Sequence, residues 1–212
     1  MLNNWFKKEK PFIGFAGFGG ASSGLSVAGG AGAINAAGAS VTATGITPGN
    51  GYRYHVFTSP GDFTVNSGEG EVEYMVLAGG GSAGNGHYGG GGGGGLRTNV
   101  SGNPRSVGPM TITPGTYPVV VGDGGPANSP YPDAKGDNSS FNSIVATGGG
   151  NGGDTPATDG SPVGKRGGSG GGGNYGGSPR SAGGPGNEGG FPTPQREGFP
   201  GGNGGGNGTP GN

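Results

Sequence analysis

The chain has 212 residues, of which 62 are glycine and 18 are proline. With a formal net charge of −1 and only 11% charged residues, it offers no electrostatic basis for binding nucleic acid. The complete lack of cysteine excludes disulfides and thiolate metal sites. Hydrophobic residues make up 27% of the chain, too few for a large conventional core. No apolar run is long enough for a transmembrane helix, so no membrane insertion is expected.

Residues 1–37 are the first expected segment. Residues 1–10 are a short amphipathic piece that Pro11 ends. Aromatic residues then recur at every third position among glycines, a spacing typical of an extended rod with one aromatic edge. This stripe has no evident partner in the chain, so we expect it to dock on another protein. The docking residues would be Trp5, Phe6, Phe12, Phe15 and Phe18. In the alternative, these rings fold back onto the chain's own β region.

Residues 38–147 are expected to form a β domain with inserted polyglycine runs. Alternating or continuous apolar residues predict strands at 52–58, 63–65, 71–78, 117–121 and 140–147, with 71–78 in the centre of the sheet. Residues 47–50 (Thr-Pro-Gly-Asn) have Pro and Gly placed for a type II turn. The Ile-Thr-Pro-Gly sequence of residues 46–49 recurs at 112–115. A third Thr-Pro-Gly, at 209–211 and followed by Asn212, suggests that the sequence belongs to a longer polypeptide.

Residues 148–212 lack strand signals and consist of glycine runs separated by polar spacers. Collagen is excluded because glycine does not recur strictly at every third position. A flexible linker would lack the hydrophobic segments found between the earlier glycine runs, and a disordered tail is the third option. We favour a fourth interpretation, in which the runs are polyglycine II helices that hydrogen-bond side by side. The expected fold class is therefore mainly β, a short antiparallel sheet or sandwich merged with a packed bundle of polyglycine II helices.

The residue pattern holds no catalytic constellation. His55 lies in an expected strand and His87 in a glycine-rich loop, and neither is near a paired-carboxylate or cysteine pattern. We therefore expect no enzyme activity, no cofactor and no metal. Asn99 and Asn138 begin formal glycosylation sequons, which matter only in a eukaryotic secreted protein.

Any receptor contact is expected on the spacers, because the rods expose only backbone that lateral hydrogen bonds already occupy. Tyrosine, phenylalanine and arginine give a large contact area for few immobilised torsions, and aromatic rings also stack on sugars. The candidate receptor-facing residues are Tyr88, Arg97, Tyr131, Tyr175, Arg180, Phe191, Arg196 and Phe199. Their natural partner is a host-surface glycan or an outer-membrane protein. The alternative is that single rings such as Tyr175 and Phe191 merely cover rod ends.

Residues 52–153 combine three distinctive stretches: YRYHVFTSPGDFTV, PGTYPVVVGDGG and DNSSFNSIVATGGGNGG. Together these resemble the glycine-rich domain of tailed-phage fibre proteins. Residues 148–212 are similar in composition to the receptor-binding tip adhesins of T-even-like phages. The resemblance implies a virion structural protein attached to a tail or capsid protein by its N-terminus, with a homotrimer as one arrangement. Two alternatives stay open: a purely structural fibre spacer, and a polyglycine-type extracellular or ice-binding protein.

Overall fold

The structure, a computed structural model, describes residues 34–40, 42–49, 52–84, 89–100, 102–103, 106, 109–127, 134–153, 163–174, 181–186 and 198–203. The expected docking residues Trp5, Phe6, Phe12, Phe15 and Phe18 lie outside this part. The described part contains strands β1 to β9 and no helix, so the predicted mainly β fold is confirmed. Accordingly, no described helix is long and apolar enough to cross a membrane.

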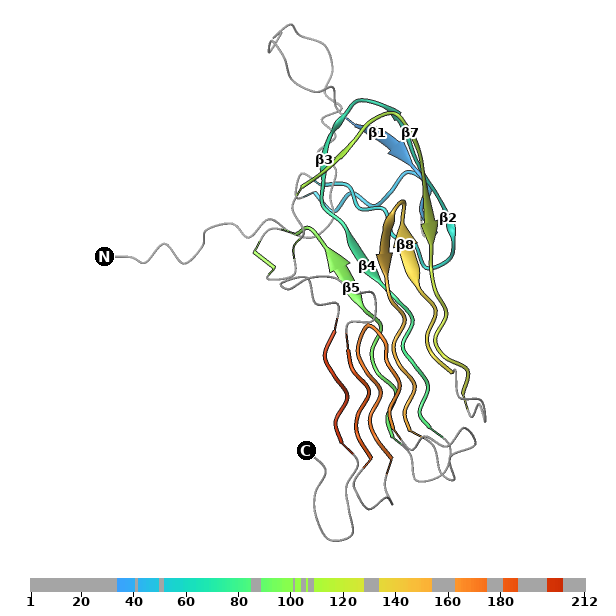
Figure 1. Ribbon diagram of the computed structural model, residues 1–212. Coiled ribbons are helices and arrows are strands. Elements are labelled where there is room, and N and C mark those ends of the chain that lie inside the picture. Colours follow the sequence, from blue (N-terminus) through green and yellow to red (C-terminus); the bar gives the residue numbers. More distant parts are fainter. Residues whose placement is uncertain are drawn as a thin grey trace, which may run out of the picture. The chain divides into compact units, whose positions relative to one another are not determined.

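The strands are short and form three separate sheets (Figure 1). The largest has the order β1-β2-β7-β8-β9, and the pairs β3-β6 and β4-β5 form the other two. The pairs β1–β2, β3–β6, β7–β8 and β8–β9 are antiparallel. The strands are β1 (Asn35–Ala37), β2 (Gly61–Ser67), β3 (Gly70–Val72), β4 (Met75–Leu77), β5 (Leu96–Thr98), β6 (Met110–Ile112), β7 (Gly115–Val120), β8 (Ser139–Phe141) and β9 (Ile144–Ala146).

The chain divides into two compact units that alternate along the sequence. Unit 1 contains Met1–Met75 and Thr98–Tyr117, and unit 2 contains Val76–Arg97 and Pro118–Asn212. Unit 1 holds strands β1, β2, β3 and β6. Unit 2 holds β8, β9 and most of the glycine-rich segments, so the candidate site described below belongs to it.

The core of unit 1 is small and aromatic. Along β2 the side chains alternate between buried and exposed, with Phe63 and Val65 buried as the period of two requires. The Phe63 ring lies edge-on to His55, with centroids 5.0 Å apart, and 6.3 Å from the ring of Tyr117. Ile112 of β6 is fully buried. These contacts give unit 1 a conventional, if modest, hydrophobic core.

The prediction of one continuous central strand over residues 71–78 is wrong. The segment instead contributes β3 to one sheet and β4 to another, with Glu73 and Tyr74 between them. The buried side chain of Asn99 spans this break by bonding the backbone of Tyr74 and Val72, each at 2.7 Å. Both amide atoms of Asn99 are thus used inside the fold, so its formal sequon is not an accessible glycosylation site.

Two other strand predictions differ from the structure. Residues 140–147 form a hairpin rather than one strand, because the chain turns at Asn142, whose φ of 52° is left-handed. Residues 52–58 form no strand; Tyr54 makes only an isolated bridge to Ile46. The turn predicted at residues 47–50 agrees with a φ of 88° at Gly49. Strands β1, β5 and β6 were not predicted, since each has only three residues.

Candidate binding surface on the glycine rods

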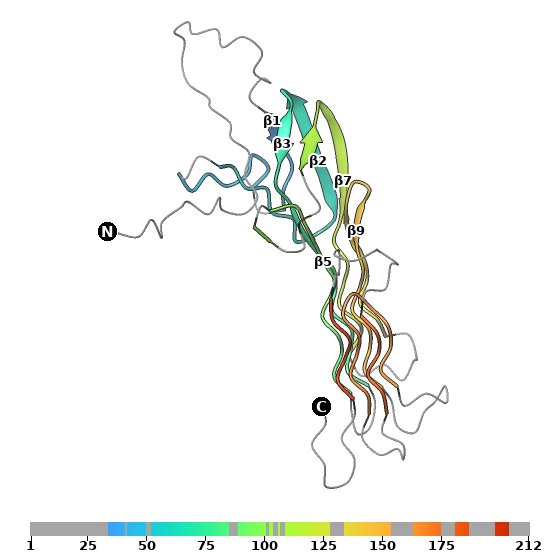
Figure 2. The same ribbon diagram turned by 60° about the vertical axis from the view of Figure 1, so that its left-hand side comes forward.

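Extended segments of unit 2 carry most of its glycine and are called rods here. Figure 2 shows them running alongside one another. In chain order they are rod 1 (residues 78–84), rod 2 (89–95), rod 3 (121–127), rod 4 (134–138), rod 5 (147–153), rod 6 (163–167), rod 7 (168–174), rod 8 (181–186) and rod 9 (198–203).

The rods are joined by backbone hydrogen bonds that recur at every third residue. Between rods 1 and 2 the amides donate from Ala78 to Gly95 (3.1 Å), from Gly81 to Gly92 (2.8 Å) and from Gly84 to Gly89 (3.0 Å). This is an antiparallel pairing with three residues per turn, as in a polyproline II-type helix. None of the rod glycines is among the described glycines with positive φ, which agrees with that helix. The hydrogen bonds therefore support the polyglycine II arrangement predicted from the sequence.

Each rod bonds to several neighbours, which arranges the rods in layers. Three successive amides of rod 7 illustrate this. Ser169 donates to Gly93 of rod 2, Gly170 to Phe199 of rod 9, and Gly171 to Lys165 of rod 6. Taken over all these bonds and close contacts, rods 3, 1 and 2 form one layer, rods 4, 5, 7 and 9 a second, and rods 6 and 8 a third. Rods 5 and 7 lie in the middle layer, where their N–H and C=O groups bond to rods on both sides.

Close packing explains why the inner positions are glycine. A Cβ on Gly92 would lie 2.2 Å from the carbonyl oxygen of Ser169, and one on Gly81 would lie 2.3 Å from that of Gly150. Real Cβ atoms do not approach backbone this closely, so any side chain there would separate the rods. In contrast, a Cβ on Gly90 would meet nothing within 4 Å. Glycine is therefore required by the fold only on the faces that touch another rod.

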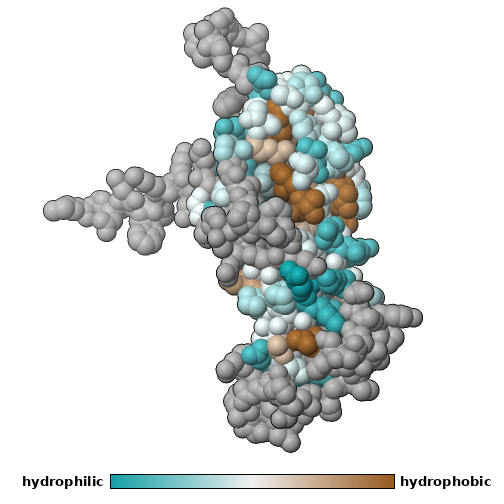
Figure 3. All heavy atoms as spheres, viewed as in Figure 1, coloured by the Kyte–Doolittle hydropathy of each residue, from teal (hydrophilic) through white to brown (hydrophobic). Residues whose placement is uncertain are grey.

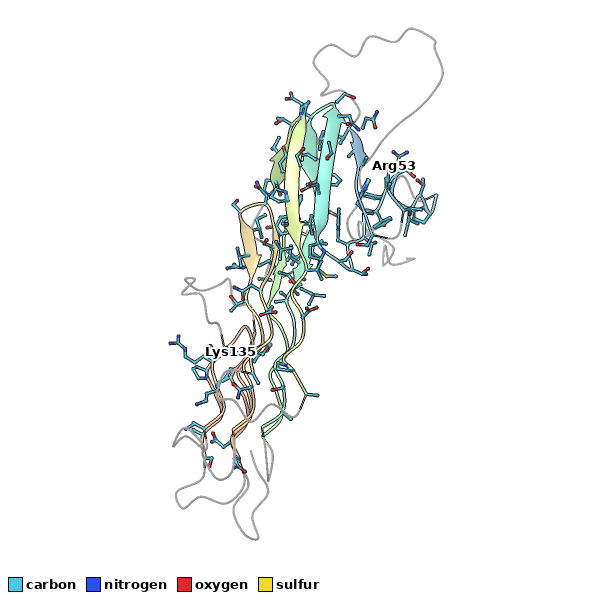
Figure 4. All side chains as sticks on the ribbon, turned by 90° about the vertical axis from the view of Figure 1, so that its right-hand side faces the viewer. Arg53 and Lys135 are labelled. Atoms are coloured by element: carbon cyan, nitrogen blue, oxygen red, sulfur yellow. The ribbon has the colours of Figure 1, made fainter. Side chains whose placement is uncertain are left out.

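The rods carry few side chains compared with the strands (Figure 4). Those present, such as Lys135 of rod 4, emerge where no neighbouring rod lies against the backbone. The exceptions are five buried side chains: Ser82, Ala134, Asn151, Asn174 and Ser181. Among the described residues, neither amide atom of Asn174 nor the Ser181 hydroxyl has a hydrogen-bond partner.

Four of the connections between rods begin and end at the same end of the bundle. Rods 1 and 2 meet at Gly84 and Gly89. Rods 3, 5 and 7 run parallel to rod 1, as shown by bonds such as Gly149 to Gly79 and Gly152 to Ser82. They therefore finish at the same end, here called the distal end. The connections anchored there are residues 85–88, 128–133, 154–162 and 175–180, whereas the connection 187–197 is anchored at the opposite end.

Six of the predicted receptor-facing residues fall in these connections, outside the described residues. Tyr88, Tyr131, Tyr175 and Arg180 belong to connections anchored at the distal end, and Phe191 and Arg196 to the connection at the opposite end. Phe199 is described and is 61% exposed. It stands on rod 9 rather than on a spacer, and its carbonyl accepts a hydrogen bond from Gly170.

The prediction that Arg97 is exposed on a loop is wrong. Arg97 lies in β5 and is only 5% exposed. Its Nε donates to the carbonyl oxygen of Val145 at 3.2 Å, so the guanidinium is held inside unit 2. The sequence does not indicate this burial, because β5 has only three residues and directly follows the all-glycine rod 2.

The described residues contain no group of three His, Asp or Glu side chains that could hold a metal ion. Burial lowers the pKa of His55; its hydrogen bond to the Gly38 carbonyl opposes this shift, and the nearby charge of Arg53 adds to it. His55 Nδ1 lies 2.8 Å from that carbonyl oxygen, which can only accept, so Nδ1 carries the proton. His55 and Arg53 both belong to unit 1, and Figure 4 shows Arg53 away from the rods.

Comparison with known proteins gives one result. The family model of the glycine-rich domain matches residues 57–212, more than half of the chain. No curated protein and no solved structure matches the chain. The chain therefore belongs to the glycine-rich domain family.

Proposed function

We propose that this chain is a structural protein of a phage virion, a tail or capsid fibre or adhesin. In this proposal residues 1–18 dock on another virion protein, and the connections between rods contact the host surface. The resemblance described above suggests the class of protein. The observation that carries the receptor-binding part is the gathering of four connections at the distal end of the rod bundle.

The rods suit this role because their backbone bonding does not depend on side chains. Hydrogen bonds such as Gly92 to Gly150 (2.7 Å) and Gly150 to Ser169 (2.9 Å) fix where each connection begins and ends. The sequence of a connection can then change without removing a contact that holds the rods together. A frame of this kind can present variable surfaces, as loops on rigid scaffolds commonly do.

The distal connections contain the side chains best suited to binding. Tyr88, Tyr131, Tyr175 and Arg180 offer aromatic faces and a planar cation for a host-surface glycan or an outer-membrane protein. Phe191 and Arg196 offer the same chemistry at the opposite end. Arg97 is left out because it is buried. The proposed role requires neither catalysis nor a cofactor.

The test uses labelled protein and a panel of bacterial cells. A distal variant carries Y88A, Y131A, Y175A and R180A, and a matched variant carries F191A and R196A at the other end. Cells that bind the unmodified protein should lose the distal variant and retain the matched one. Loss of binding only in the matched variant would move the receptor contact to the opposite end. No binding to any cell, or undiminished binding of both variants, would contradict the receptor-binding role.

The docking role has a separate test. Removing residues 1–18 should leave the thermal unfolding of the remaining chain unchanged while abolishing its incorporation into particles. If particles incorporate the truncated chain normally, these residues are not the attachment segment.

A further inference from the structure

We propose that the outer side of rods 1, 2 and 3 is an interface through which two copies of this chain pair face to face. The inference rests on the geometry of unit 2 alone and goes beyond the proposed receptor binding. It assigns a partner to a surface that none of the described residues covers.

This outer side follows from the three-residue period. In rod 1, Cβ atoms on Gly79 and Gly81 would strike backbone in rods 3 and 5, whereas one on Gly80 would meet only a carbonyl oxygen at 3.7 Å. Every third residue from Gly80 therefore faces away from the bundle. In rods 2 and 3, the positions of Gly93 and Gly124 face outward for the same reason, with nearest atoms at 4.0 and 3.6 Å.

Nine residues make up this surface, called the outer face: Leu77, Gly80, Ala83, Gly90, Gly93, Leu96, Val121, Gly124 and Ala127. Not one carries a charged or polar side chain. All but Leu96 and Val121, which are half-buried, are exposed, and Leu77 is 55% exposed. Figure 3 shows hydrophobic residues, in brown, at the surface in several places. The outer face itself combines three aliphatic side chains, those of Leu77, Leu96 and Val121, with glycine backbone and two alanines.

The outer face is ordered across the rods as well as along them. The pairing that joins Gly81 to Gly92 places Leu77 beside Leu96, Gly80 beside Gly93, and Ala83 beside Gly90. Rod 3 runs parallel to rod 1 and adds Val121, Gly124 and Ala127 to these rows in the same order. The face thus has a row of large aliphatic side chains, a row made only of glycine, and a row of small residues.

A second copy of the same face fits this relief. Consider a two-fold axis that lies in the plane of contact, parallel to the rows and midway between the aliphatic row and the glycine row. Rotation about this axis places the aliphatic row of each copy against the glycine row of the other. Such an isologous contact needs only one self-complementary surface. The lack of charge on the face removes any like-charge repulsion between copies, and burial of Leu77, Leu96 and Val121 provides the driving force.

The stacking of the rod layers also favours a second copy of the chain as the partner of the outer face. The inner side of rods 1 and 2 already packs against rods 5 and 7 with backbone in direct contact, as at Gly92 and Ser169. The outer side repeats the same three-residue period, so another layer of rods continues this stacking. Gly90 and Gly93 have room for side chains within one copy, yet both are glycine. A closely packed neighbour outside the chain accounts for this choice.

The interface is small, since standard interfaces use about 20–30 residues a side. We therefore expect a dimer with a dissociation constant of about micromolar or weaker. Sedimentation equilibrium of the purified chain over a concentration series should show a reversible monomer–dimer transition. Gly93→Glu should weaken it at least about tenfold, because it places a charge in the glycine row. Leu77→Ser should weaken it as well, by removing an aliphatic contact.

The control is Ala182→Glu, which adds the same charge on rod 8 in the third layer, where Ala182 is exposed. It should dimerise like the unmodified chain, and all variants should keep its circular dichroism. Because the chain has no cysteine, Gly93→Cys and Ala182→Cys add a direct probe. In the proposed dimer the two copies of position 93 lie one turn of rod apart, about 9 Å along the rods, so a short bis-maleimide reagent should cross-link only the Gly93→Cys variant across the dimer. A monomer up to millimolar concentration, a trimer, or a Gly93→Glu variant that dimerises normally would overturn the proposal. These results do not depend on whether the chain binds a host.

Discussion

The side-chain amide of Asn99 bonds the backbone N–H of Tyr74, as the backbone of a neighbouring strand would do in a sheet. Its Oδ1 accepts the Tyr74 N–H at 2.7 Å, while its Nδ2 donates to the carbonyl of Val72 at 2.7 Å. The Thr98 hydroxyl completes the arrangement by donating to the Tyr74 carbonyl at 2.8 Å. These bonds satisfy buried backbone at the point where the chain leaves β3 and enters β4. The change of sheet is thus stabilised by the polar side chains of Asn99 and Thr98.

Replacing Asn99 by alanine should therefore destabilise unit 1 strongly. The substitution leaves a buried N–H and a buried C=O without partners, which costs about 2–4 kcal/mol in all. Urea unfolding followed by tyrosine fluorescence measures the loss. Asn66→Ala, at an exposed position of β2, is the control and should change the free energy of unfolding by less than about 0.5 kcal/mol. Equal effects of the two substitutions would show that Asn99 does not have this role.

Stability should fall as the pH drops below the ordinary pKa of histidine because of His55. Burial favours the neutral ring, so the pKa of His55 is lower in the folded than in the unfolded chain. Its contribution is complete above the unfolded pKa of 6.5 and is lost as the pH falls through the folded value. One such group changes the free energy of unfolding by at most about 1.4 kcal/mol per pH unit.

Comparing the unmodified chain with His55→Gln between pH 7 and pH 5 isolates this effect, since His87 is present in both. The variant should be less stable at pH 7, and its melting temperature should depend less on pH. Parallel pH profiles for the two proteins would mean that His55 is not held neutral by the fold.

The turn between β8 and β9 should tolerate glycine but not valine at position 142. Asn142 has a φ of 52°, and its N–H donates to the Pro118 carbonyl at 2.8 Å. A β-branched residue adopts this conformation at a cost of about 1–2 kcal/mol, whereas glycine adopts it freely. Thermal unfolding of Asn142→Val and Asn142→Gly measures the difference. If valine is as well tolerated as glycine, the turn does not hold this φ in solution.

The sequence reveals the glycine rods more readily than it reveals the strands. A run such as 89–95 predicts a rod because a backbone without side chains can form few ordered structures. The hydrogen bonds of rod 2 agree with the polyglycine II arrangement. The residues at which strands begin and end are harder to predict from the sequence. The apolar residues of 71–78 do not show that Asn99, distant in sequence, divides the segment between two sheets.

The candidate site could be predicted only in outline. That spacers separate rods is visible in the sequence, but the end of the bundle at which each spacer leaves depends on rod direction. Rod direction becomes known only from bonds between distant glycines, such as Gly149 to Gly79. Arg97 shows the same limit, because its burial depends on β9, which lies nearly fifty positions later in the chain. The outer face likewise requires the register of rods 1, 2 and 3.

The central claim is that the rods are a packed lattice in which glycine is required on inward faces and not on outward ones. Gly92 and Gly93 are adjacent, yet a Cβ on Gly92 would lie 2.2 Å from backbone, and one on Gly93 would meet only the Ser169 hydroxyl at 4.0 Å. At concentrations where the chain is monomeric, Gly92→Ala should lower the free energy of unfolding by about 3 kcal/mol. Gly93→Ala should leave it unchanged or raise it by about 0.4–1 kcal/mol through the unfolded state. Equal effects of the two substitutions on the free energy of unfolding would contradict the lattice.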